Sequence, residues 1–188
     1  MAEVHQSKSG TGYSGGQRGR SLPSSPDAER AVLSAILLNE DNIAHVADLL
    51  APKDFFQRPN QIVYQALLDL YKDNKKIDII VMQDHLGARG QLEAAGGVVY
   101  LLELQEDIPS IGLIAQHAKI VKDKALLRSL ISSSSDIIRL CYEQGDKEVE
   151  GLLDQAEKSI FQVSNLVTTT AFQPLGDLLK GTFKRLAK

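Results

Sequence analysis

Apolar residues recur at helical spacing along most of the chain, and helix signals flank them. The first ordered segment begins at Ser25-Pro26-Asp27, where Ser suits a helix cap, Pro is tolerated in the first turn, and Asp suits the positive end of the helix dipole. A globular helical bundle over residues 25–110 is therefore predicted. Its helices are expected near residues 25–37, 41–50, 59–72 and 78–88 and through residues 100–104.

The longest uninterrupted helical pattern runs from Ile111 to about Tyr142, and a second runs from Lys147 to about Asn165. At about 1.5 Å per residue these arms measure about 48 Å and 28 Å, whereas a unit of ~100 residues has a radius of gyration near 13 Å. A helical hairpin over residues 111–165 should therefore project from the bundle. An alternative is that the four serines at 132–135, which are mediocre helix formers, break the first arm so that it folds back.

A projecting hairpin needs a partner for its apolar stripe, and another copy of the same hairpin is the simplest one. Six residues are predicted to take part in hairpin self-association, although they could equally hold one hairpin together: Leu126, Leu130, Ile137, Leu152, Leu153 and Ile160.

The two ends of the chain differ from its middle. Residues 1–24 are rich in Gly and Ser and are expected to be a disordered arm. Residues 166–173 are expected to be an extended linker, and residues 174–188 are expected to form a separate amphipathic linker helix. This helix should dock on a neighbouring subunit or on a further domain; the alternatives are folding back on its own domain or lying on a membrane surface. The docking residues would be Leu175, Leu178, Leu179 and Phe183.

Charge is unevenly distributed. The net charge of the chain is −3, but residues 1–24 carry +2 and residues 174–188 carry +3, which leaves −8 on residues 25–173. Because nucleic-acid affinity rests largely on Lys and Arg, this acidic body argues against a stand-alone nucleic-acid-binding protein. A single cysteine, Cys141, excludes an internal disulfide framework. No segment resembles a signal peptide or a membrane span, so a cytoplasmic protein without a membrane partner is expected.

Catalytic patterns are missing from the sequence. The Gly10–Gly15 stretch matches G-x-G-x-x-G but follows no predicted strand and opens no predicted helix. The four histidines are scattered, and none has a metal-ligand spacing to another histidine or to the cysteine. We therefore expect no catalytic, cofactor or metal site in this chain, and a small helical enzyme has no candidate residues.

Three groups of residues in register resemble one family. They are Ser25–Leu33; Ala51–Phe56 with Ile77-Asp78 and Gly96–Leu101; and Ile108–Ser110 with Ala118–Val121, Lys124 and Leu126–Ile131. Their order and spacing are similar to the N-terminal domain of the bacterial replicative DNA helicase, the DnaB family. The sequence departs from the family pattern at Asp27, Ser34, Asn60, Val81, Leu113 and His117.

This resemblance implies an all-α fold, a compact multi-helix bundle followed by a long helical hairpin. It implies that hairpins pair and assemble as a trimer of dimers, a collar on a hexameric ring. The collar would bind the primase C-terminal domain and helicase loaders, with Ile114, His117 and Val121 as candidate surface residues. The linker helix would dock on a neighbouring motor domain, which would hold ATP and Mg and pass single-stranded DNA. The competing interpretation is a helicase-binding adaptor, such as the C-terminal domain of a primase.

Overall fold

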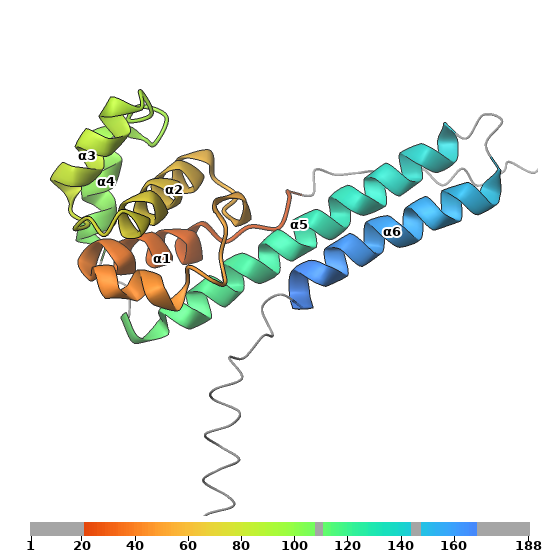
Figure 1. The fold of residues 1–188 in the computed structure, drawn as a ribbon, viewed down its shortest axis with the longest axis horizontal. Coiled ribbons are helices and arrows are strands. Elements are labelled where there is room, and N and C mark those ends of the chain that lie inside the picture. The colour runs from red at the N-terminus through yellow and green to blue at the C-terminus, as the bar shows by residue number, and fades with distance from the viewer. Residues whose placement is uncertain (1–20, 108–110, 144–147, 169–188) are drawn as a thin grey trace, which may run out of the picture.

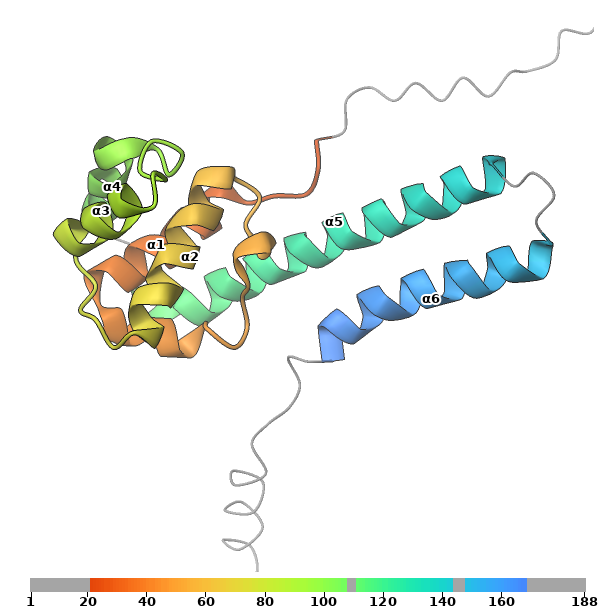
Figure 2. The same cartoon turned by 45° about the horizontal axis from the view of Figure 1, so that its top comes forward.

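The computed structural model describes residues 21–107, 111–143 and 148–168, and all of its regular elements are helical. Four helices form a bundle: α1 (Pro26–Leu38), α2 (Arg58–Lys72), α3 (Ile79–Ala88) and α4 (Gly97–Glu106). From the bundle projects α5 (Ile114–Tyr142), and α6 (Val149–Thr168) returns beside it as the second arm of a hairpin (Figures 1 and 2). The all-α prediction is confirmed.

Short 3₁₀ turns fill the connections, and one of them corrects the sequence prediction. Residues 41–50 do not form an α-helix; the turn η1 (Glu40–His45) and irregular turns occupy this segment. The Asn39 side chain accepts a hydrogen bond from the backbone N–H of Asp41, and the Asn42 amide donates to the carbonyl of Ala35 at 2.7 Å. These bonds close the C-terminal end of α1, so side-chain capping replaces helical continuation. The other turns are η2 (Pro52–Asp54) and η3 (Ile111–Leu113).

The hairpin arms also differ from prediction in detail. The serines at 132–135 lie inside α5, which continues without a break, and the Ser135 hydroxyl donates to the carbonyl of Ile131 at 2.9 Å. The alternative of a broken arm is therefore wrong. Helix α6 continues to Thr168, so residues 166–168 are helical where an extended linker was expected.

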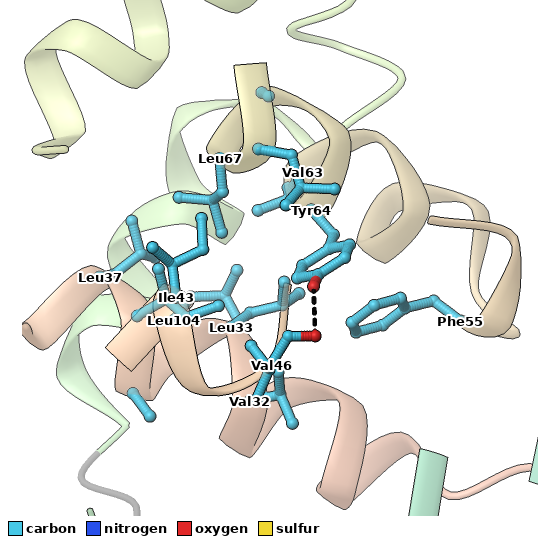
Figure 3. Packing of buried hydrophobic residues seen from close by; sticks show 14 of the residues in the cluster. Val32, Leu33, Leu37, Ile43, Val46, Phe55, Val63, Tyr64, Leu67 and Leu104 are labelled. Carbon is cyan, nitrogen blue, oxygen red and sulfur yellow. Dashed lines mark hydrogen bonds between the residues drawn. The ribbon is translucent and has the colours of Figure 1, made fainter. Parts of the chain in front are cut away.

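The core lies between the four bundle helices, the η1 segment and the first turns of α5. Figure 3 shows its part between α1, α2 and the η1 segment, with Leu104 of α4. At its centre the rings of Phe55 and Tyr64 are 4.7 Å apart, and the Tyr64 hydroxyl donates to the carbonyl of Val46 at 3.3 Å. Burial of the Tyr64 phenol raises its pKa well above the ordinary range, and the carboxylates of Asp54 and Asp48 add to the effect. This packed core is the base from which the hairpin projects.

Candidate functional site: the helical hairpin

The first three turns of α5 belong to the bundle. Ile114, Ala118, Val121 and Ala125 recur at helical spacing, and each is at most 7% exposed. This row faces α1 and η2, so the lower part of α5 is as much a core helix as α1 is. Beyond Arg128 the helix leaves the bundle, and α6 is the described element that lies beside it (Figure 2).

A second face of α5 forms the seam with α6. On α5 the half-buried residues include Leu126, Ser133 and Ile137; on α6 they are Leu152, Ala156, Ser159, Val163 and Leu166. Three of the six residues predicted for self-association therefore lie inside the hairpin of one chain: Leu126, Ile137 and Leu152. The other three, Leu130, Leu153 and Ile160, are 42%, 64% and 43% exposed.

The third face of α5 is apolar and exposed. The sequence predicts an apolar stripe on the hairpin, but none of the α5 residues of this face is among the six predicted for self-association. The large exposed side chains of this face are Ile120, Leu127, Ile131, Ile138 and Tyr142, and those beside the seam on α6 are Val149, Leu153 and Ile160. We call these eight residues the open face. Ile138 is 57% and Leu153 64% exposed, so the described part of the chain covers neither of them.

The two rows of the open face lie on one side of the hairpin. At 3.6 residues per turn, the α5 row lies roughly 130° around its helix from the seam, and the α6 row lies roughly 80° around in the same rotational sense. Because α5 and α6 are antiparallel, rotations of the same sense lead to the same side. The row of α5 that faces the bundle lies in the opposite sense. Both rows of the open face therefore lie on the same side of the hairpin, turned away from the bundle.

The three residues predicted for a primase or loader surface are buried or half-buried rather than exposed in the structure. Ile114 and Val121 are 6% and 1% exposed and belong to the core, so we withdraw them as surface residues. His117 is half-buried, and its Nδ1 atom has no hydrogen-bond partner among the described residues. The arm residues 1–20, the linker residues 169–173 and the predicted docking residues Leu175, Leu178, Leu179 and Phe183 lie outside the described residues.

Two cations of α5 fix the direction in which the hairpin leaves the bundle. The Lys122 ammonium lies 3.0 Å from a carboxylate oxygen of Asp54. The Arg128 guanidinium donates to the carbonyls of Pro23 and Asp54 and lies 5.5 Å from the centre of the Phe56 ring. These partners are more than 65 residues apart in sequence, which is why no local pattern could indicate them.

The described residues hold few features of a catalytic centre. No group of three or more His, Cys, Asp or Glu side chains is placed to bind a metal ion within those residues. The cavities at the surface are open and small, with volumes of about 220 to 290 Å³. No helix in the described ranges is long and apolar enough to cross a membrane. The feature with the clearest functional meaning is therefore the open face.

Comparison with known proteins gives one answer. The family model of the DnaB-like helicase N terminal domain matches residues 21–123. The replicative DNA helicase DnaB of Pasteurella multocida is 36% identical over 148 residues, which cover 79% of this chain and 32% of that protein. The replicative DNA helicase DnaC of Bacillus subtilis is 35% identical, and the match covers 87% of this chain and 36% of that protein. The chain thus spans about a third of the length of the curated relatives that it matches.

Solved structures agree. The crystal structure of the N-terminal domain of DnaB helicase from Mycobacterium tuberculosis superposes with a TM-score of 0.71 at 34% identity, covering 76% of this chain and 99% of that chain. A DnaB-like replicative helicase, described together with its interactions with primase, shares the fold at a TM-score of 0.63 and 24% identity; the match covers 75% of this chain and 31% of that chain. The bundle, the hairpin and these similarities lead to one conclusion: the chain belongs to the family of DnaB-like helicase N-terminal domains.

Proposed function

We propose that this chain is the assembly domain of a hexameric replicative DNA helicase, and that it self-associates through the open face. Family membership supports this role, because the curated relatives are replicative helicases and match over about a third of their length. The chain itself would act as an assembly module. ATP hydrolysis with Mg and translocation on single-stranded DNA would belong to the remainder of the helicase, in the cytoplasm.

The observation that carries the proposal is the exposure of the open face. Contiguous exposed apolar surface on a folded domain typically marks an interaction site. Each large side chain contributes roughly 1.5–3 kcal/mol when it is fully buried, so eight partly exposed ones offer enough free energy for stable pairing. In a two-fold symmetric dimer each copy buries its own open face, so every residue of that face contributes twice to the free energy of association. Pairs of hairpins would then build the collar as a trimer of dimers.

Docking of primase and of a helicase loader is the second part of the proposal. This docking is proposed from family membership alone. Primase or the loader would contact the collar during DNA replication. With Ile114 and Val121 in the core, the contact surface has to be sought among exposed side chains of the bundle and the hairpin.

Light scattering over a concentration series tests self-association. We expect a dimer or a larger assembly for the parent chain, and a shift toward monomer for Ile138→Lys, which places a charge in the open face. The matched control is Ile80→Lys, because Ile80 is 77% exposed on α3, in the bundle. A strict monomer at high micromolar concentration, or equal dissociation by both variants, would contradict the proposal. A monomer would instead favour the adaptor interpretation.

A further inference from the structure

Two open pockets adjoin at the η2 turn. One lies between η2, α5 and the end of α6 and has a volume of about 240 Å³. The other lies between η2 and α2 and has a volume of about 220 Å³. Lys53 lines both. We call the two together the η2 groove, and they lie on the side of α5 that faces the bundle, opposite the open face.

Cations dominate the lining of the η2 groove. Among the described residues it contains Lys53, Arg58, Lys122 and Arg128 but a single carboxylate, Asp54. This gives the groove a net charge of +3 on a chain whose net charge is −3. A concave surface lined by one sign of charge concentrates ligands of the opposite sign.

The positive charge is largely uncompensated. The Asp54 carboxylate is engaged by the Lys122 ammonium at 3.0 Å and by the backbone N–H of Ala51 at 2.9 Å. Arg128 donates to two backbone carbonyls, which carry no net charge. Arg58 donates to the side-chain oxygen of Gln61 at 3.2 Å, and across the described ranges neither Arg58 nor Lys53 forms an ion pair.

The other lining residues narrow the class of ligand. Ser129, Ser132, Gln61, Gln65 and Gln91 supply hydroxyl and amide groups, which suit a peptide backbone and carboxylate side chains. No aromatic ring from the described part of the chain lines either pocket, whereas proteins that bind single-stranded nucleic acid usually stack bases on aromatic side chains. The open, shallow shape suits a segment lying across the surface rather than an enclosed small molecule.

We propose that the η2 groove binds an acidic peptide segment of a partner protein, with Asp or Glu side chains of the peptide placed between Lys53, Arg58 and Arg128. Such a peptide contacts the bundle through η2 and α2 and the hairpin through α5 and Leu166 of α6. Its binding therefore holds the hairpin in one orientation relative to the bundle. This surface is separate from the open face, so peptide binding and self-association are independent.

Fluorescence anisotropy with the full chain tests the proposal. The probe is a labelled peptide of about twelve residues that alternates Glu with Gly, and the comparison ligands are the same peptide with Gln in place of Glu and a thymidine oligonucleotide of similar length. The groove variant is Lys53→Gln with Arg58→Gln. The matched control is Lys72→Gln with Lys76→Gln, because both lysines are exposed, lie outside the groove and carry the same charge.

We expect the Glu peptide to bind more weakly as salt increases, and the groove variant to lose about tenfold in affinity while the control variant changes less than about twofold. The Gln peptide should not bind. Equal binding to both variants, no binding of the Glu peptide at millimolar concentration, or a stronger groove-dependent affinity for the oligonucleotide would each overturn the proposal. Light scattering of the groove variant should give the parental mass; dissociation would identify a second copy as the occupant and also overturn it.

Discussion

The buried carboxylate of Glu29 accepts a hydrogen bond of 2.7 Å from the backbone N–H of Phe56, 27 residues further along the chain. The same carboxylate accepts from the backbone N–H of Gln57 at 3.3 Å and from the side-chain amide of Asn60 at 2.9 Å. The amide oxygen of Asn60 in turn accepts from the hydroxyl of Tyr100. One acidic side chain of α1 thus holds the segment that leads from η2 into α2, and through Asn60 it is connected to α4. The ring of Phe56, whose backbone it binds, lies beside Arg128.

Glu29→Ala should destabilise the bundle strongly, because it leaves three donors without an acceptor in a site where Glu29 is 1% exposed. Bonds to a charged group contribute about 1.5–3 kcal/mol each, so the loss of all three should cost at least about 4 kcal/mol. Urea unfolding followed by circular dichroism gives the value. Glu106→Ala, at an exposed position of α4, is the control and should change stability by less than about 0.5 kcal/mol. Similar losses in both variants would show that the carboxylate of Glu29 has no special role.

Arg128→Ala should loosen the hairpin at its base without unfolding the bundle, because it removes two carbonyl contacts and the contact with Phe56. The exposed Cys141 near the end of α5 and an Ile80→Cys substitution on α3 provide two spin-label sites. Double electron–electron resonance, in samples diluted with unlabelled chain, should show a broader distance distribution in the variant. Arg139→Ala, which removes an exposed cation of the same helix, is the control and should keep the parental distribution. If the distance distribution of Arg128→Ala were as narrow as that of the parent, Arg128 would not be what holds the hairpin at its base.

The buried Tyr64 phenol should make the folded protein less stable as the pH rises into the alkaline range. Burial raises its pKa in the folded state above the ordinary value of 10.0, so the unfolded chain releases this proton first as pH rises. The contribution is fully present below about pH 10 and is lost as pH rises further toward the folded-state pKa. Tyr64→Phe cannot ionise, and its stability should therefore fall less steeply between pH 9 and 11. Urea midpoints of parent and variant measured across this range test the sign.

At neutral pH the same substitution has a smaller effect. Tyr64→Phe removes one hydroxyl hydrogen, which is shared between the carbonyls of Val46 at 3.3 Å and Leu50 at 3.4 Å, and should cost about 1 kcal/mol. Parallel pH profiles of the two proteins would show that Tyr64 does not cause the alkaline loss.

Two glycine substitutions should act in opposite directions. Gly96 has φ of +96°, and a Cβ atom there would lie 2.8 Å from the Cβ of Tyr100, so Gly96→Ala should cost about 2 kcal/mol or more. Gly87 lies inside α3, and no described atom comes within 4 Å of the place where an added methyl group would sit, so Gly87→Ala should stabilise by about 0.5–1 kcal/mol. Thermal unfolding of both variants gives the two signs directly. A stabilising Gly96→Ala would mean that the turn before α4 rearranges freely.

Local signals determine where most helices begin and end. Asp78 caps α3 through a local bond, in which its carboxylate accepts from the backbone N–H of Val81 at 2.8 Å. Pro26 begins α1 as expected, although the Ser25 side chain forms no capping bond within the described residues. The prediction of a helix over residues 41–50 is wrong. The apolar residues of this segment have helical spacing, but the Asn42 amide bonds to the carbonyl of Ala35, seven residues earlier, and this contact with α1 favours a turn.

The sequence by itself determined that α5 is long, helical and apolar, since its period and its lack of Pro are local properties. Only the tertiary structure decided what each apolar residue does. Val121, Leu126 and Leu127 are equally apolar, yet Val121 is in the core, Leu126 lies in the seam, and Leu127 is 46% exposed on the open face. Their roles depend on where the bundle and α6 lie around the helix axis. That arrangement is set by contacts such as Lys122 with Asp54, which join residues 68 positions apart.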